Sequence, residues 1–254
     1  MPTGRFRRLH LNLPGSPEGA AFDQDMILKC VVIGRERLAW QEGIRYFAAV
    51  DMSGGSSDDA VLVIFHIDGK TVVIDHISKQ IGEPPFSPRS AVSQFCMRLR
   101  EWHISKVYDD AYGGQTFRGD FETMQVEYEV RTRSASDLYE RLEPLLNQRE
   151  IELLDHPTLI EQMVGLVWKG QRITHESNSH DDFATAVALA AAVAREQMTD
   201  GDFVVVPPII IYGEPRNVPN SVFPKDAYPG VHAGSPMKPS RLEPWWPYYN
   251  PGVY

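Results

Sequence analysis

Three groups of aspartates stand at the ends of apolar runs, where side chains that do chemistry are commonly presented. Asp51 follows one run in FAAVDMSGG, and Asp109 with Asp110 follows another in VYDDAYGG. Asp181 and Asp182 precede an Ala-rich run in SHDDFATAVALAAA. A carboxylate at the carboxyl end of a strand, or at the start of a helix, can project into a crevice beside the sheet. We therefore expect acidic groups from three distant segments to meet at one site.

Such a site favours a hard divalent cation. Carboxylates brought together repel one another unless a cation offsets their charge, and oxygen ligands suit Mg²⁺ or Mn²⁺. Two ions about 4 Å apart can activate a water and stabilise the leaving oxygen of a phosphodiester. We predict Asp51, one aspartate of the pair at 109–110 and one of the pair at 181–182 as catalytic residues and metal ligands, with two ions bound. The wider set of predicted metal ligands is Asp51, Asp58, Asp109, Asp110, Asp181 and Asp182.

Each of these aspartates also has a plainer interpretation. An aspartate before paired glycines commonly forms a turn, and acidic residues are favoured in the first turn of any helix. The residues at 58–59 begin a strand and are either secondary ligands or turn residues. Asp182 shares a helix face with Ala186 and Leu189, so we expect it nearer the sheet than Asp181. Only the joint arrangement favours a site.

The elements that must position these acids can be predicted from apolar spacing. Close spacing of the first three β-rich runs favours an antiparallel meander, because parallel strands need longer crossovers. Those strands are expected at 46–52, 60–67 and 71–77. Helices are expected at 88–103, 114–124, 134–148 and 157–167, with strands at 105–109, 126–130 and 151–154. An Ala-rich helix at 180–197 closes the pattern.

This order of elements is typical of an α/β, ribonuclease H-like fold with a central mixed sheet, three antiparallel strands and then parallel ones, flanked by helices. We assign 1–40 to a lead-in, 41–206 to the ribonuclease H-like nuclease domain and 207–254 to a tail. The tail is rich in proline and aromatic residues and has no period. It either docks on a partner or on the domain, or is an extension without function.

Composition narrows the class of protein. The formal net charge of −9 argues against a domain that grips nucleic acid by bulk electrostatics, but bound cations would offset an acidic metal site. No apolar run is long enough to span a membrane, and the opening residues lack the apolar core of a signal peptide. The two cysteines have no metal-type spacing, and the eight histidines form no His-x-x-x-His pair. We expect a protein that is not secreted and binds neither membrane nor zinc.

The acidic motifs resemble those of the large subunit of tailed-phage terminases, in its C-terminal nuclease domain. FAAVDMSGGSSDDAVLVIFHIDG resembles the family's first strand, acidic residue and second strand, and SHDDFATAVALAAA resembles its closing helix. VYDDAYGGQ resembles the second acidic motif, in which an aromatic residue follows the acid two places on, so Asp110 with Tyr112 is the better match. The resemblance thus implies Asp51, Asp110 and Asp182 as the catalytic residues. The opening RFRRLHLN resembles the segment that joins the family's ATPase and nuclease domains.

The resemblance implies a divalent-metal endonuclease that cuts concatemeric double-stranded viral DNA in the host cytoplasm. It also implies an ATPase motor, a portal protein and a small terminase subunit as partners. The chain has no GxxxxGK[ST] phosphate loop, since the GKT at 69–71 lacks the upstream glycine. The chain is thus either a nuclease domain of a longer protein or a separately encoded subunit.

Three other classes share part of this pattern. A resolvase- or transposase-like nuclease would place its acids similarly but is usually more basic. A phosphotransferase of the sugar-kinase and actin type would use VDMSGG and DDAYGGQT as phosphate loops, yet needs a second lobe. A catalytically silent assembly module would not need acids at all three places.

Overall fold

The computed structural model describes residues 19–110, 115–176 and 179–199, all within one compact unit spanning Met1–Pro207. Its centre is a seven-stranded sheet in the order β1-β7-β4-β3-β2-β5-β6. The strands are β1 (Val31–Val32), β2 (Tyr46–Asp51), β3 (Val61–Asp68), β4 (Thr71–Lys79), β5 (Lys106–Asp109), β6 (Glu127–Val130) and β7 (Ile151–Leu154). A separate two-stranded sheet joins β8 (Val167–Lys169) to β9 (Arg172–Thr174).

The predicted meander is confirmed, because β2 pairs antiparallel with β3 and β3 antiparallel with β4. Beyond it the sheet is parallel on both sides. β5 lies beside β2 and β6 beside β5, whereas β7 pairs with β4 and β1 pairs with β7. The predicted mixed sheet of an α/β protein is therefore present. Parallel pairing of β2 with β5 brings their carboxyl ends, which carry Asp51 and Asp109, to the same edge.

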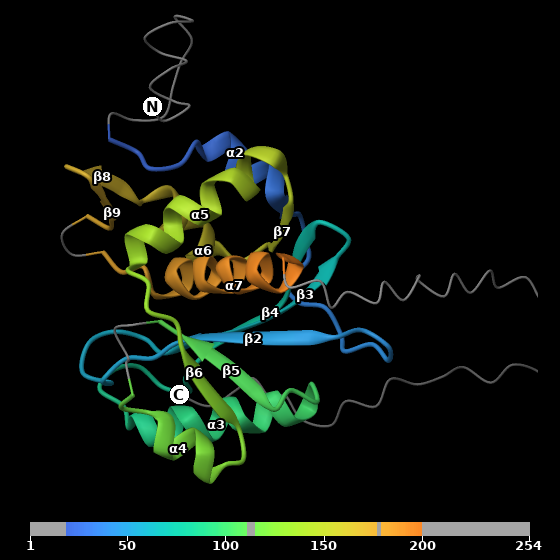
Figure 1. Cartoon of the computed structure of the whole chain (residues 1–254). Helices are drawn as coiled ribbons and strands as arrows, with labels where there is room; N and C mark the ends of the chain where they lie inside the picture. The colour runs from blue at the N-terminus through green and yellow to red at the C-terminus, as the bar shows by residue number, and fades with distance from the viewer. Residues whose placement is uncertain (1–18, 111–114, 177–178, 200–254) are drawn as a thin grey trace, which may run out of the picture. The chain divides into compact units, whose positions relative to one another are not determined.

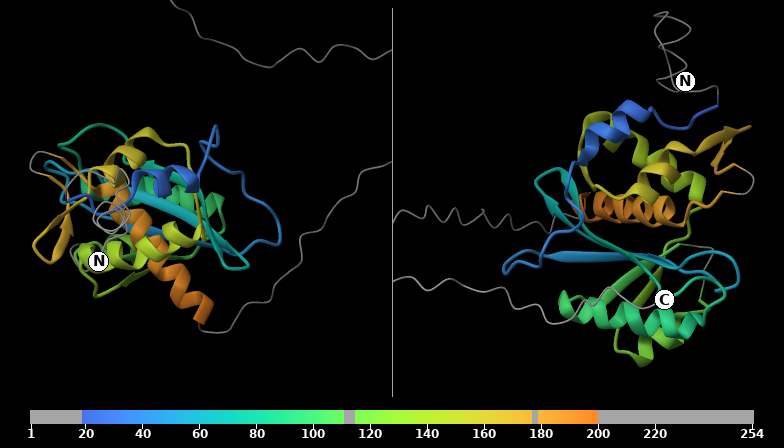
Figure 2. Two further views of the ribbon diagram at one scale, coloured as in Figure 1. Left: turned by 90° about the horizontal axis from the view of Figure 1, so that it is seen from above. Right: turned by 180° about the vertical axis from the view of Figure 1, so that it is seen from behind.

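Helices cover both faces of the sheet (Figures 1 and 2). They are α2 (Gln24–Cys30), α3 (Pro88–Glu101), α4 (Arg118–Thr123), α5 (Ala135–Gln148), α6 (Pro157–Val164) and α7 (Asp182–Thr199). α3 and α4 lie on one face, and α7 lies on the other beneath α2, α5 and α6. Successive residues of β2 alternate between the two cores, with Phe47 and Ala49 facing α7 and Ala48 and Val50 facing α3.

α7 is buried along most of its length. From Phe183 to Ala194 every residue is buried, because the helix lies between the sheet and the outer helices. Alanine predominates in this stretch, so the helix backbone can approach the sheet and its neighbours closely. The position of Asp182 at the start of α7 is consequently tied to the core of the protein.

Three details differ from the predicted elements. The predicted helix at 157–167 ends at Val164, and Val167 belongs to the β8–β9 hairpin, which was not predicted. The predicted helix at 114–124 is shorter, as α4 spans Arg118–Thr123. In the predicted lead-in, the apolar patch at 26–33 forms most of α2 and all of β1, which packs on β7. The boundaries of the lead-in, nuclease domain and tail stay predictions, and the tail at 207–254 lies outside the described residues.

In the part of the chain that the structure describes, no helix has the length and apolar character needed to cross a bilayer.

Candidate active site

A cavity of about 920 Å³ opens where β2 and β5 end and α7 begins. Five aspartates line it: Asp51, Asp58, Asp110, Asp181 and Asp182. Three separate elements thus bring their acidic side chains to one place, as the spacing predicted. Asp109 is the one predicted ligand that is absent from the lining among the described residues.

Asp51 is the last residue of β2 and is partly buried. Burial, reinforced by the negative charges of Asp110, Asp109 and Asp182, raises the pKa of the Asp51 carboxyl well above its ordinary value. Carboxylates in a poorly solvated space repel one another, and a bound cation would stabilise their ionised forms. Asp51 is therefore at the electrostatic centre of the acidic group.

The two aspartates after β5 have opposite surroundings. Asp110 lines the cavity and is only 5% exposed. Asp109 is fully buried, and its carboxylate accepts hydrogen bonds from the Tyr128 hydroxyl and from the Asp110 backbone amide, at 2.8 Å for the amide. Burial raises the pKa of Asp109 to about 8, although the bonds from Tyr128, Asp110 and the Met52 amide act in the opposite direction. Asp109 therefore braces the ends of β2 and β5 from within the core. Tyr112, predicted to mark this motif, lies outside the described residues.

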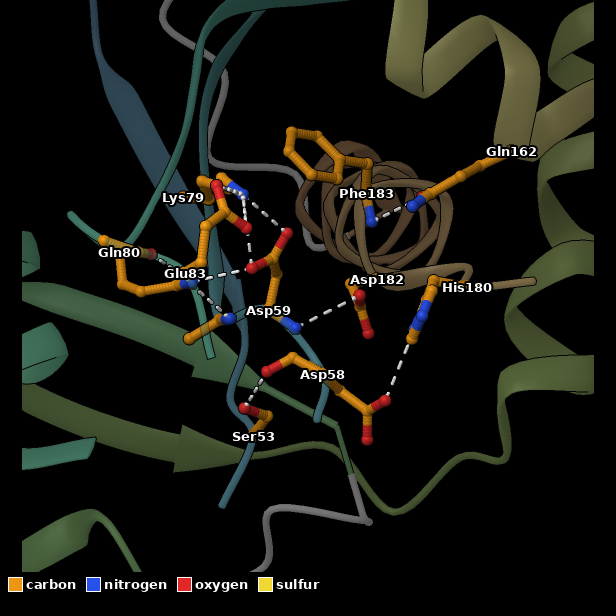
Figure 3. A network of polar contacts seen from close by, with 12 residues as sticks. Ser53, Asp58, Asp59, Lys79, Gln80, Glu83, Gln162, His180, Asp182 and Phe183 are labelled. Atoms are coloured by element: carbon orange, nitrogen blue, oxygen red, sulfur yellow. Dashed lines mark hydrogen bonds and ion pairs between the residues drawn. The ribbon is translucent and has the colours of Figure 1, made fainter. Parts of the chain in front are cut away.

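Asp182 is the first residue of α7 and faces the cavity. Its Oδ2 accepts a hydrogen bond of 3.3 Å from the backbone amide of Asp59, as Figure 3 shows. Burial raises the pKa of Asp182 to about 6, and the Asp59 amide partly counteracts this. The segment that leads into β3 and the helix α7 are thus joined at the rim of the cavity.

Asp181 has a different support, the buried Tyr139 of α5. The Tyr139 hydroxyl donates to Asp181 Oδ2 at 2.7 Å and lies 2.7 Å from Thr185 Oγ1 one turn along α7. His175 Nε2 is 3.9 Å from Asp181 Oδ1. Asp181 and Asp182 both reach the cavity, but they are held by different elements.

Asp58 and Asp59 also differ in orientation. Asp58 lines the cavity, half exposed, with His180 Nδ1 at 3.3 Å from its Oδ1. The Asp59 carboxylate instead turns toward Lys79 Nζ at 3.1 Å and Gln80 Nε2 at 2.6 Å. Asp59 therefore acts on the site through its backbone amide, whereas Asp58 presents its side chain.

Several supporting residues were not singled out from the sequence. Tyr128 and Tyr139 hold Asp109 and Asp181, but at the level of spacing they are ordinary apolar positions of a strand and a helix. Arg133, on the segment between β6 and α5, is another of these residues. It lines the cavity while its Nη2 lies 2.7 Å from Glu196 Oε1. Contacts between residues so far apart in the chain leave no local signal.

The donor chemistry of the site fits a hard divalent cation. The cavity presents carboxylate oxygens, the ligands preferred by Mg²⁺ and Mn²⁺. Burial, together with the charges of neighbouring aspartates, raises the pKa values of Asp51 and Asp182. Among the residues that the structure describes, no three His, Cys, Asp or Glu side chains are already grouped closely enough to hold a metal ion. The fit therefore rests on the kind and the charge of the donors.

The fold is similar to that of phage terminase nucleases of known structure. The large terminase nuclease from thermophilic phage G20c with bound magnesium is similar, with a TM-score of 0.59, 15% identity, and coverage of 69% of this chain and 98% of that one. Further structures of the G20c nuclease contain cobalt and zinc. No family model matches the chain, and no curated protein matches it in sequence.

Two longer terminases match over part of their length. The HK97 bacteriophage large terminase aligns with a TM-score of 0.54 and 13% identity, covering 75% of this chain and 47% of that one. A large terminase from another thermophilic bacteriophage aligns with a TM-score of 0.56 and 11% identity, covering 75% and 49%. The chain thus spans about half the length of these two proteins. At these identities the likeness shows the fold, which is ribonuclease H-like, as predicted.

Proposed function

We propose that this chain is the nuclease part of a viral genome-packaging machine, a divalent-metal-dependent endonuclease that cuts double-stranded DNA concatemers. The observation that carries the proposal is the single cavity lined by Asp51, Asp110 and Asp182, which come from β2, the end of β5 and α7. The shared fold with terminase nucleases, one of them containing magnesium, supports it. Acids at all three places favour an enzyme over a silent assembly module.

The residues have distinct parts in the proposed reaction. Asp51, Asp110 and Asp182 would hold two Mg²⁺ or Mn²⁺ ions, with Asp58 and Asp181 beside them in the same cavity. When bound, the ions would supply activation of a water and stabilisation of the charge on the leaving oxygen. The carboxylates would orient the ions, and Asp109 would support Asp110 from the core.

In this proposal the chain works in the cytoplasm of the infected host with a motor that delivers the DNA. The ATPase motor, the portal protein and the small terminase subunit are its proposed partners.

Replacing the three cavity acids tests the proposal. We expect Asp51→Asn, Asp110→Asn and Asp182→Asn each to lower cleavage of plasmid DNA in Mn²⁺ by more than about 100-fold, because each removes a charged metal ligand. Asp68→Asn, an exposed aspartate at the last position of β3, is the matched control. Circular dichroism and thermal unfolding would show that each variant folds. Cleavage at wild-type rates in all three variants would refute the assignment.

A further inference from the structure

Two glutamines hold Asp182 from two sides, and the first acts on its backbone. The first amides of a helix have no intrahelical acceptor. At the start of α7 a side chain from α6 supplies one, since Gln162 Oε1 accepts from the Phe183 amide at 2.8 Å and from the Ala184 amide at 3.1 Å (Figure 3). The residue directly before these two amides is Asp182. Gln162 therefore fixes the backbone from which the Asp182 side chain extends.

The second glutamine acts on the Asp182 carboxylate through residue 59. The Asp59 amide donates to Asp182 Oδ2, and Asp182 Oδ1 accepts no hydrogen bond from the described residues. One oxygen is thus anchored while the carboxylate borders the cavity. The direction of this anchor depends on how the backbone at Asp59 is held.

Gln80 holds that backbone from the end of β4. Its Nε2 donates to Asp59 Oδ1 at 2.6 Å and to the Gly82 carbonyl at 3.1 Å, and its Oε1 accepts from the Ala60 amide at 2.7 Å. The backbone amide of Gln80 donates to the Ala60 carbonyl at 3.1 Å. Gln80 is only 2% exposed, so loss of these bonds would leave buried polar groups without partners. Lys79 also contacts Asp59 but is shared with the exposed Glu83 and is the weaker support.

We propose that Gln80 and Gln162 are positioning residues for Asp182, which together orient its carboxylate toward the metal ions. This inference rests on the proposed function. Neither glutamine lines the cavity, so both act through other groups. Partners that orient metal ligands in this way typically change metal affinity by about 10- to 100-fold when they are removed.

The experiment compares Mn²⁺ binding, measured by electron paramagnetic resonance of the free ion, in matched variants of the full chain. Gln80→Met and Gln162→Met remove the bonds at nearly constant size, and each is expected to raise the half-saturating Mn²⁺ concentration by about tenfold or more. Gln94→Met is the control, because Gln94 Oε1 likewise accepts a backbone amide, that of Ile81 at 2.7 Å, without touching Asp59 or Asp182. Its half-saturating concentration should stay within about twofold of wild type.

Replacing each glutamine with glutamate keeps the side-chain size but changes its hydrogen bonds, so the two effects can be separated. Gln162→Glu keeps an acceptor for the Phe183 and Ala184 amides at a helix start, where negative charge is favoured, so Mn²⁺ binding should persist. Gln80→Glu replaces the donor to Asp59 with a second carboxylate, so binding should weaken as in Gln80→Met. A residue that only fills space would respond alike at both positions.

A readout without metal completes the test. Hydrogen exchange of the Asp59 amide should be faster in Gln80→Met than in wild type and unchanged in Gln94→Met. Wild-type Mn²⁺ affinity in both methionine variants, or unchanged Asp59 exchange in Gln80→Met, would overturn the inference and leave the proposed function standing. Wild-type protein that binds no Mn²⁺ would instead refute the proposed function, and with it the role of both glutamines toward a metal.

Discussion

Asp109 and Asp110 are neighbours in the chain, but the fold gives them different tasks. Asp110 borders the cavity, whereas the Asp109 carboxylate lies in the core against Tyr128. Burial raises the pKa of Asp109 to about 8, so this carboxyl is charged less readily near neutral pH than an exposed aspartate, and its hydrogen bonds to the core become its main contribution. The side-chain amide of an asparagine has the same shape; its oxygen can accept from the Asp110 backbone amide, and its nitrogen can donate to the Tyr128 hydroxyl oxygen.

The two residues can therefore be distinguished by the same substitution. Asp109→Asn should retain cleavage within about tenfold of wild type, since the buried hydrogen bonds can be kept, whereas Asp110→Asn should reduce it by more than about 100-fold. Plasmid cleavage in Mn²⁺ is the measurement. Equal loss in both variants would place Asp109 among the ligands.

The raised pKa values also predict how the stability of the metal-free protein depends on pH. Some carboxyl groups have a higher pKa in the folded protein than in the unfolded chain. Such a group contributes its full stabilisation at pH values below its ordinary pKa of 3.8, and this contribution is lost as the pH rises through its pKa in the folded protein. The windows end at about 6 for Asp182 and about 8 for Asp109. In the presence of a chelator, the midpoint temperature of thermal unfolding should therefore decrease as the pH is raised from about 5 to about 8.

Substitution of Asp109 and addition of Mn²⁺ should each change this pH dependence. Asp109→Asn should flatten the fall between pH 6 and 8, because it removes the group that titrates there. Mn²⁺ at pH 8 should raise the unfolding midpoint, since ligand bound only to the folded state stabilises it. A midpoint that rises steadily from pH 5 to pH 8 in wild-type protein with chelator would contradict these assignments.

At the scale of elements, the loop between β2 and β3 depends on one glycine. Gly55 has a φ of +78°, and a Cβ there would meet the Phe86 carbonyl oxygen at 2.3 Å. The same two residues are joined by a hydrogen bond of 2.8 Å from the Phe86 amide to the Gly55 carbonyl. This contact holds the loop that carries Ser53 and Asp58 against the segment before α3.

Gly55→Ala should therefore destabilise the protein, by at least about 1–2 kcal/mol for the left-handed backbone alone, with the clash added. Gly54→Ala is the matched control, because a Cβ at Gly54 would meet nothing within 4 Å. Urea unfolding of both variants gives the free energies. Equal stability of the two variants would contradict the account of this loop.

Some helices and strands can be predicted from the sequence, whereas others depend on distant contacts. Long periodic segments were predicted well. The helix predicted at 134–148 is α5, and it begins after a capping box formed by Ser134 and Asp137. The β8–β9 hairpin was missed because its strands have three residues each, too few for a period, and follow directly after α6. β1 was missed because its partner β7 lies about 120 residues further on, so nothing local marks it as a strand.

For the candidate site, the sequence predicted which segments carry the acids, but not what holds them. The bonds of Gln80, Gln162 and Tyr139 to the acidic segments cross between elements, and such contacts depend on tertiary packing. The choice of Asp110 over Asp109 rests on the family resemblance, because the spacing of the motif does not separate the two residues. Alternation along an extended chain explains their opposite surroundings, but the sequence does not tell which side faces the cavity.

At the scale of the molecule, a net charge of −9 and an acidic cavity would oppose an approaching phosphodiester backbone without cations. Divalent ions in the cavity offset this repulsion at the place where the proposed chemistry occurs. In the proposed machine, a motor would hold and deliver the DNA, so the nuclease need not bind it tightly alone. The proposed nuclease activity therefore depends on metal binding by the aspartates.

A crystal soaked in Mn²⁺, examined for anomalous scattering, tests that dependence most directly. We expect anomalous peaks in the cavity between the carboxylates of Asp51, Asp110 and Asp182, with Asp109 still turned toward Tyr128. Peaks elsewhere on the protein, or none in the cavity at high Mn²⁺ concentration, would contradict it.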